Sequence, residues 1–244
     1  MKLTVIGHWG GYPKVGEASS GYLLEHNGFK LLVDCGSAVL SQLQYYLKPT
    51  DLDAVIVSHY HPDHVADIGV FQHALLIGKY TDGFSGNIPI YGHQEDQAGF
   101  TALTYKSITT GVAYMGDEPL HIGPFQIEFI KTIHPVPCYA MRIKAGSKTL
   151  IYTADTAYFP ELVDFSQDGD LLLCESNYYK DMKKSAFNHM TSDQAGQLAQ
   201  LANVKQLVLT HLPHFGDYEQ LMSEAKEKYS GDTILASSGL ILTI

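Results

Sequence analysis

The segment SHYHPDH, residues 58–64, decides the fold because it crowds metal-binding side chains into one short loop. Those side chains are His59, His61, Asp63 and His64. A neutral imidazole is a common metal ligand, and several in succession rarely serve packing. The loop follows an apolar run, residues 53–59, that is typical of a buried strand. The segment therefore predicts a metal site, completed by side chains from elsewhere in the chain.

Composition places the chain among globular proteins and disfavours two classes of partner. Its 244 residues suit one large α/β domain, and its 45% apolar and 17% charged content is ordinary. The net charge of −10 repels phosphate backbones, which disfavours a large nucleic-acid interface. No apolar run approaches the roughly 20 residues that span a bilayer, and the N-terminal run is too short for a signal peptide. We predict a cytoplasmic protein that does not bind membranes.

The three cysteines do not suggest disulfides or a zinc ribbon. Cys35, Cys138 and Cys174 are few, odd in number and widely spaced. We predict reduced thiols, buried at strand ends.

Hydrophobic periodicity predicts one domain, residues 1–244, with two similar halves rich in strands and helices. Predicted strands cover residues 3–7, 53–59, 87–92, 125–134, 148–155, 170–176, 205–211 and 233–244, and a hairpin with HNG as its turn covers 19–36. Predicted helices cover 64–78, 94–105, 191–203 and 217–229. The third helix opens with a capping box of Thr191 and Gln194.

Five functional side chains close apolar strands, where layered α/β folds assemble their sites. They are His59, His134, Asp155, Glu175 and His211. Catalytic zinc takes histidine nitrogens and carboxylate oxygens, and the ligand count suits two ions. One ion is expected at His59, His61 and His134, the other at Asp63, His64 and His211, with Asp155 bridging both. Two ions about 3.5–4 Å apart can hold a hydroxide between them.

The motif HYHPDH resembles the H-x-H-x-D-H signature of the metallo-β-lactamase superfamily. This resemblance extends along nearly the whole chain and implies a four-layer αββα sandwich. The RNase Z branch and its small phosphodiesterase relatives are the most similar. GHWGGYP, SSGYLL, LLVDCG and HPVPCYAMRI carry that likeness, with the block NHMTSDQAGQLAQLANVKQLVLTH.

The resemblance implies catalytic roles for two further residues, His189 and Glu175. In that branch the matching histidine and glutamate are implicated in protonating the leaving oxygen. A histidine oriented by a carboxylate is a suitable donor near neutral pH, so the transfer is chemically reasonable. Asp63 is expected to orient the hydroxide as well as to bind metal. His214, His8 and His93 are candidate substrate contacts.

Two departures from the RNase Z pattern argue against transfer-RNA processing. Only 21 positions separate His134 from Asp155, which leaves no room for the long substrate arm of that branch. RNase Z enzymes carry an arginine in the segment after the last ligand. The matching segment here is THLPHFGDY, with His214 near the position of that arginine. RNA is therefore a disfavoured partner, and a small-molecule phosphodiester is preferred.

These observations predict a dinuclear metal-dependent hydrolase for small or cyclic phosphodiesters, acting through a metal-bridging hydroxide. We expect two zinc ions per chain, although manganese or iron would also suit the ligands. Alternatives on the same metals are hydrolysis of lactones, thioesters or sulfate esters, or arm-less tRNA 3′-processing. A non-catalytic carrier or sensor is a further alternative, disfavoured by the intact ligand set. The resemblance also suggests a homodimer.

Overall fold

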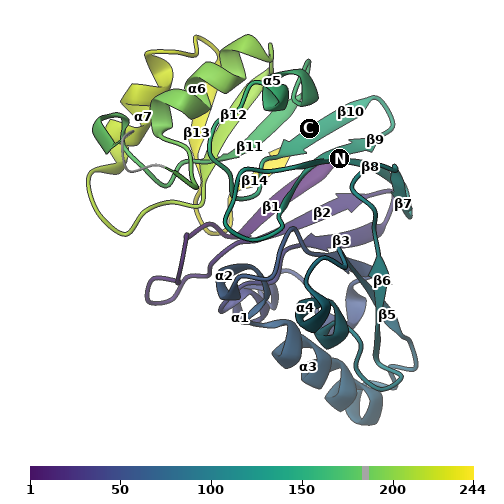
Figure 1. Cartoon of the computed structure of the whole chain (residues 1–244). Coiled ribbons are helices and arrows are strands. Elements are labelled where there is room, and N and C mark those ends of the chain that lie inside the picture. The colour runs from purple at the N-terminus through teal and green to yellow at the C-terminus, as the bar shows by residue number, and fades with distance from the viewer. Residues whose placement is uncertain (183–186) are drawn as a thin grey trace. The chain divides into compact units, whose positions relative to one another are not determined.

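Two mixed sheets of seven strands each organise the chain (Figure 1). The computed structural model describes residues 1–182 and 187–244. The first sheet lies in a unit formed by Met1–Met115 and Ser238–Thr243, and the second in a unit formed by Gly116–Ser237. We call these unit 1 and unit 2.

The sheet of unit 1 has the strand order β14-β1-β2-β3-β4-β5-β6. Its strands are β1 (Lys2–Gly7), β2 (Gly21–His26), β3 (Phe29–Val33), β4 (Ala54–Ile56), β5 (Ile88–Gly92), β6 (Thr109–Ala113) and β14 (Ile241–Thr243). Strands β3 to β6 are parallel, so the residues that follow them meet at one edge. The predicted hairpin is confirmed: Asn27 and Gly28 both have positive φ, as a two-residue type I′ turn requires.

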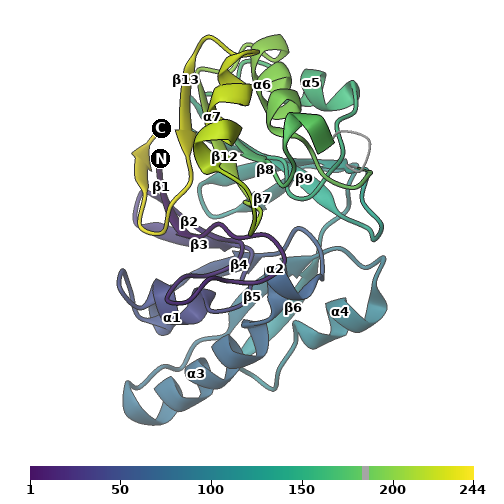
Figure 2. The ribbon, with the colours of Figure 1, turned by 90° about the vertical axis from the view of Figure 1, so that its left-hand side faces the viewer.

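The helices of unit 1 lie on one face of its sheet (Figure 2). They are α1 (Val39–Leu43), α2 (Pro62–Val65), α3 (Ile68–Thr81) and α4 (Gln97–Ala102), with a short 3-10 turn η1 at Pro49–Asp51. Phe71 and Leu75 of α3 pack with Leu32 and Val55 of the sheet to form the core. Burial of such side chains contributes about 1.5–3 kcal/mol each.

Two predicted helices of unit 1 differ from the observed ones. The helix expected over 64–78 is interrupted near Asp67, whose amide donates to the Cys35 carbonyl and whose carboxylate accepts from the Leu40 amide at 2.9 Å. This tertiary hydrogen bonding separates α2 from α3. The helix expected over 94–105 is shorter, because Asp96 caps α4 by accepting from the Gly99 amide.

The sheet of unit 2 has the strand order β13-β12-β11-β10-β9-β8-β7. Its strands are β7 (Leu120–Ile122), β8 (Phe125–Lys131), β9 (Tyr139–Ala145), β10 (Lys148–Tyr152), β11 (Leu171–Glu175), β12 (Gln206–Thr210) and β13 (Asp232–Leu235). Its helices are α5 (Glu161–Phe165), η2 (Lys180–Met182), α6 (Ser192–Leu201) and α7 (Tyr218–Lys226). The predicted Thr191–Gln194 capping box is confirmed at the start of α6. Strands β10 to β13 are parallel, so they also share a carboxyl edge.

The single closing strand predicted over 233–244 is wrong. The structure forms two strands there, β13 in unit 2 and β14 in unit 1. Gly239 lies between the two strands with φ 84°, a conformation that glycine adopts easily. Its amide donates to the carbonyl of Val5 in β1, so the chain has joined the sheet of unit 1 by this residue. Ser237, Ser238 and Gly239 interrupt the apolar pattern between the two strands, but this break does not show that the second strand joins the other sheet.

The predicted burial of the cysteines is confirmed, because Cys35, Cys138 and Cys174 are all buried. Burial raises the pKa of the Cys35 and Cys174 thiols, which keeps them protonated. Within residues 1–182 and 187–244, no helix has the length and apolar character needed to cross a bilayer.

Candidate functional site

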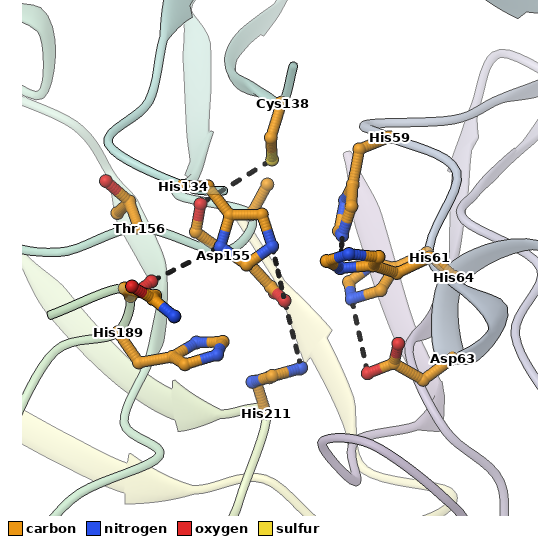
Figure 3. A network of polar contacts seen from close by, with 12 residues as sticks. His59, His61, Asp63, His64, His134, Cys138, Asp155, Thr156, His189 and His211 are labelled. Carbon is orange, nitrogen blue, oxygen red and sulfur yellow. Dashed lines mark hydrogen bonds and ion pairs between the residues drawn. The ribbon is translucent and has the colours of Figure 1, made fainter. Parts of the chain in front are cut away.

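The first ligand cluster, His59, His61, Asp63 and His64, lies between β4 and the end of α2 in unit 1. Pro62 occupies the first turn of α2, where its fixed φ suits the helix start, and this sets the direction of the following side chains. His59 Nε2 and His61 Nδ1 lie 3.1 Å apart (Figure 3). Two nitrogens on one tetrahedral zinc lie about 3.3 Å apart. The spacing of this pair therefore fits ligands of a single ion.

His64 is oriented by Asp34, which the sequence analysis did not identify as a functional residue. The His64 Nδ1 donates to Asp34 Oδ2 at 2.7 Å, and both side chains are completely buried. Asp34 also accepts from the Ser58 amide at 2.7 Å and the Ser58 hydroxyl at 2.8 Å. This leaves His64 Nε2 for a metal, the usual arrangement of a ligating histidine. Asp34 has φ 57°, a backbone strain typical of functional sites.

Asp63 is held by the Gly-rich turn that follows β1. Its Oδ2 accepts from the Gly11 amide at 2.7 Å and lies 3.7 Å from His64 Nε2. Asp63 is 8% exposed, so its carboxylate has little freedom to rotate. The backbone of the turn thus presets Asp63 for a ligand role next to His64.

We expect Asp34→Asn to weaken the metal held by His64 by about 10- to 100-fold, since loss of a partner that orients a ligand typically has this effect. The asparagine amide cannot accept from all three donors that surround Asp34. Competition titration with a chelator measures the affinity. Asp53→Asn is the matched control, because Asp53 also accepts from a backbone amide, that of Lys30, at an exposed position. Unchanged affinity in Asp34→Asn would remove Asp34 from the support of the site.

His8 and His93, two predicted substrate contacts, are both buried side chains of unit 1, 3% and 2% exposed. The His93 ring contacts the rings of Tyr60 and Tyr114. His8 lies against Trp9, and burial lowers the pKa of His8 from 6.5 to about 4, opposed by the charge of Glu17. Their contact with substrate stays a prediction.

The lowered pKa of His8 predicts a loss of stability in acid. Between pH 6.5 and about 4 the unfolded chain binds a proton that folded His8 does not, so the free energy of unfolding falls as pH falls. The expected loss is about 3 kcal/mol across this window, and the full contribution is present above pH 6.5. Urea unfolding of the metal-free chain at several pH values, compared with His8→Phe, measures it. The prediction would be contradicted if the free energy of unfolding fell with pH by the same amount in both proteins.

The second ligand cluster, His134, Asp155 and His211, belongs to unit 2. Asp155 follows β10 and His211 follows β12, so the parallel strands bring both to one edge. Asp155 Oδ2 lies 3.3 Å from His211 Nε2 and 3.9 Å from His134 Nε2 (Figure 3). His134 Nδ1 lies 3.3 Å from the Asn188 carbonyl, which it can donate to. The Nε2 atoms thus converge on a shared carboxylate, a donor set suited to zinc.

The backbone beside the second ligand cluster is strained. Ala154 and His211 have φ 48° and 51°, in the left-handed region that residues with side chains rarely adopt. Asn177, which the sequence analysis also missed, steadies His211 by donating to its carbonyl at 3.0 Å and lying 3.3 Å from its Nδ1. Its place two residues after Glu175 at a strand end is the one signal that could have identified it.

Glu175 and His189 form the predicted pair in unit 2. His189 Nδ1 lies 2.9 Å from Glu175 Oε1, and the glutamate is 1% exposed. Glu175 also accepts from the amides of Thr156 at 2.6 Å and Met190 at 3.2 Å. One carboxylate therefore joins the segment after Asp155 to the segment that carries His189.

The His189 ring lies directly beside the second ligand cluster. Its centroid is 5.2 Å from that of His211, with nearly parallel planes, and 5.3 Å from that of His134. The His189 side chain is 18% exposed, and its Nδ1 is engaged by Glu175. His214, the remaining predicted substrate contact, is half-buried in the segment after β12, and its role stays a prediction.

A family model described as a Beta-lactamase superfamily domain matches residues 30–212, the range that contains every predicted ligand. The chain belongs to the metallo-β-lactamase superfamily. Within this superfamily it is 51% identical over 99% of both chains to a Bacillus subtilis protein named "Probable metallo-hydrolase YhfI". The crystal structure of YhfI matches with a TM-score of 0.97 at 50% identity over 99% of this chain and 98% of the other. This confirms the predicted metallo-β-lactamase fold.

Two more distant proteins also match this chain over nearly its full length. Ribonuclease Z of Haloferax volcanii is 24% identical, over 100% of this chain and 95% of that protein. The structure of a diphosphatase from the PhnP family matches with a TM-score of 0.79 at 18% identity, over 100% of this chain and 97% of the other. The structural match at this identity concerns the fold alone.

Proposed function

We propose that the chain is a dinuclear metal-dependent hydrolase. His59, His61 and His134 would hold one ion, Asp63, His64 and His211 the other, and Asp155 would be shared. Support comes from the spacing of the donors within each ligand cluster, from the buried partners that orient them, and from the family. Zinc suits this set of nitrogen and oxygen donors, and manganese or iron would also be accepted. Bound ions would supply Lewis acidity and would acidify water.

Phosphodiesters are the proposed substrates, and the Glu175–His189 pair is the observation that carries this proposal. In hydrolysis a water oxygen bonds to phosphorus and releases one proton, and the bond from phosphorus to the alcohol oxygen breaks with its electron pair. The departing oxygen needs a proton, which His189 would donate from Nε2 while Nδ1 stays on Glu175. A thioester releases a thiolate, which is much less basic than an alkoxide and needs less help. His214, His8 and His93 are proposed contacts to the substrate.

Small phosphodiesters fit the chain better than transfer RNA. Between β9 and β10 the chain makes only a tight turn after Ala145, so no arm extends between His134 and Asp155. The net charge of −10 also disfavours a polyanionic partner. These two features favour a substrate small enough to be recognised beside the ligands themselves.

The test is hydrolysis of bis(p-nitrophenyl) phosphate, a lactone and a thioester by the zinc- or manganese-loaded chain. Preferential turnover of the phosphodiester, with two metal ions per chain, is expected. Clear lactone or thioester turnover without phosphodiester turnover would replace the proposed substrate class. Fewer than one ion per chain after reconstitution, with no turnover of any ester, would favour a carrier or sensor.

A further inference from the structure

Unit 1 contains a cavity of about 330 Å³ lined by residues of α2, α3 and α4 and of the segments beside them. Figure 1 shows where these helices lie. Tyr60, Val65, Ile68 and Leu103 form its apolar walls. A cavity of about 150 Å³ accommodates benzene, so this one has room for a ring with a short chain. Its volume lies at the lower end of the range for small-molecule sites.

Two acceptor groups give the cavity its polarity. Gln72 is 6% exposed, and its amide nitrogen donates to the Ala102 carbonyl at 2.9 Å and to Thr109 Oγ1 at 3.1 Å. Because this fixes the nitrogen, the carbonyl oxygen Oε1 is the group that Gln72 can offer to a ligand. Asp96 Oδ1 accepts from Gly99, which leaves Oδ2 for a ligand. Among the described residues, no lysine, arginine or histidine lines the cavity, so an anion has no counter-charge there.

Tyr60 makes one wall rigid. Its hydroxyl donates to the His93 carbonyl at 2.6 Å, and a Cβ at position 99 would lie 2.4 Å from its ring, so Gly99 packs against the ring face. Burial raises the pKa of Tyr60, and the phenol stays neutral. Tyr60 stands between His59 and His61 in the chain, and Val65 follows His64. A molecule in the cavity would therefore contact the loop that carries the first ligand cluster.

We propose that this cavity binds a small organic amine. The ammonium group would pair with the Asp96 carboxylate, and an aromatic or branched aliphatic body would pack on Tyr60, Ile68 and Leu103. Such a ligand is chemically unlike a phosphodiester, so this is a second binding site rather than part of the substrate site. The fixed acceptors and apolar walls are what recognise it, since an amine can both donate hydrogen bonds and pair with a carboxylate.

Titration of the metal-loaded full chain with 2-phenylethylamine, followed by protein NMR, tests the proposal. The matched probes are 2-phenylethanol, which is neutral, and 3-phenylpropionate, which is an anion. We expect the amine to bind with a dissociation constant on the order of 1 mM, as befits so small a ligand. The alcohol should bind roughly 3- to 10-fold more weakly, because it lacks the charge. The anion should not bind. Equal binding of all three probes, or no binding of the amine, overturns the proposal.

Two variants locate the bound amine. Asp96→Asn keeps the cap of α4 but removes the charge, so the preference for amine over alcohol should disappear. Asp217→Asn, the same change at the cap of α7, is the control. Gly69 also lines the cavity, and a Cβ there meets no atom within 4 Å, so Gly69→Leu should abolish binding while Gly69→Ala retains it.

An amine can also coordinate a metal ion directly, and the same variants separate the two modes. Binding in the cavity should persist in the metal-free chain and should be lost in Gly69→Leu. The assignment is overturned if Asp96→Asn still prefers the amine over the alcohol, or if Gly69→Leu still binds the amine. It is also overturned if the amine binds only to the metal-loaded chain.

Discussion

Asp155→Ala is expected to abolish hydrolysis and to lower bound metal from two ions to one or none per chain. In unit 2 this carboxylate is 2% exposed and lies within 4 Å of an imidazole nitrogen of both His134 and His211, so it links the two histidines. The expected loss of activity is roughly 10³-fold or more, because the Lewis acidity of a bound ion is worth several kcal/mol. Metal analysis and turnover of bis(p-nitrophenyl) phosphate measure both effects.

Asp164→Ala is the control for this variant, because Asp164 is an exposed carboxylate on α5 of the same unit. It should keep both ions and full turnover. Circular dichroism should show the Asp155 variant folded, since the charge it removes is not part of the hydrophobic core. Unchanged metal content in Asp155→Ala would refute the shared-ligand role and require a different carboxylate.

The strand ends made most of the candidate site predictable from sequence. His59 follows β4, Asp155 follows β10, and His211 follows β12. Each apolar run is visible by itself, and a functional side chain at its end needs no knowledge of tertiary structure. Parallel pairing then carries the residues of each sheet to one edge, as for Asp155, Glu175 and His211.

The partners that orient these ligands could not be predicted in this way. Asp34 can orient His64 because β3 pairs in parallel with β4. This pairing brings the Asp34 carboxylate to the amide of Ser58, which lies 24 positions later in the sequence. Local periodicity contains no trace of that pairing. Asn177 meets His211 only because β11 lies beside β12. The split of the closing segment into β13 and β14 has the same cause, since an apolar run does not state which sheet it joins.

His189→Ala is expected to keep both metal ions and to lose turnover selectively on substrates with poor leaving groups. General acid catalysis contributes about 10²- to 10⁴-fold, and this contribution matters most when the departing oxygen is strongly basic. An alkyl phosphodiester should therefore lose about that factor. Bis(p-nitrophenyl) phosphate, whose leaving group is stable as an anion, should lose far less. Initial rates on a series of leaving groups measure the slope against leaving-group pKa.

The slope separates a proton donor from a residue that merely supports the fold. A structural role would lower all rates by a similar factor, whereas loss of the acid steepens the dependence on the leaving group. Glu175→Gln should steepen it too, with some loss of stability, because Glu175 also accepts from the amides of Thr156 and Met190. His121→Ala, at an exposed position on β7, should leave the slope unchanged. An equal loss on both substrate types in His189→Ala would mean that the proton comes from another group.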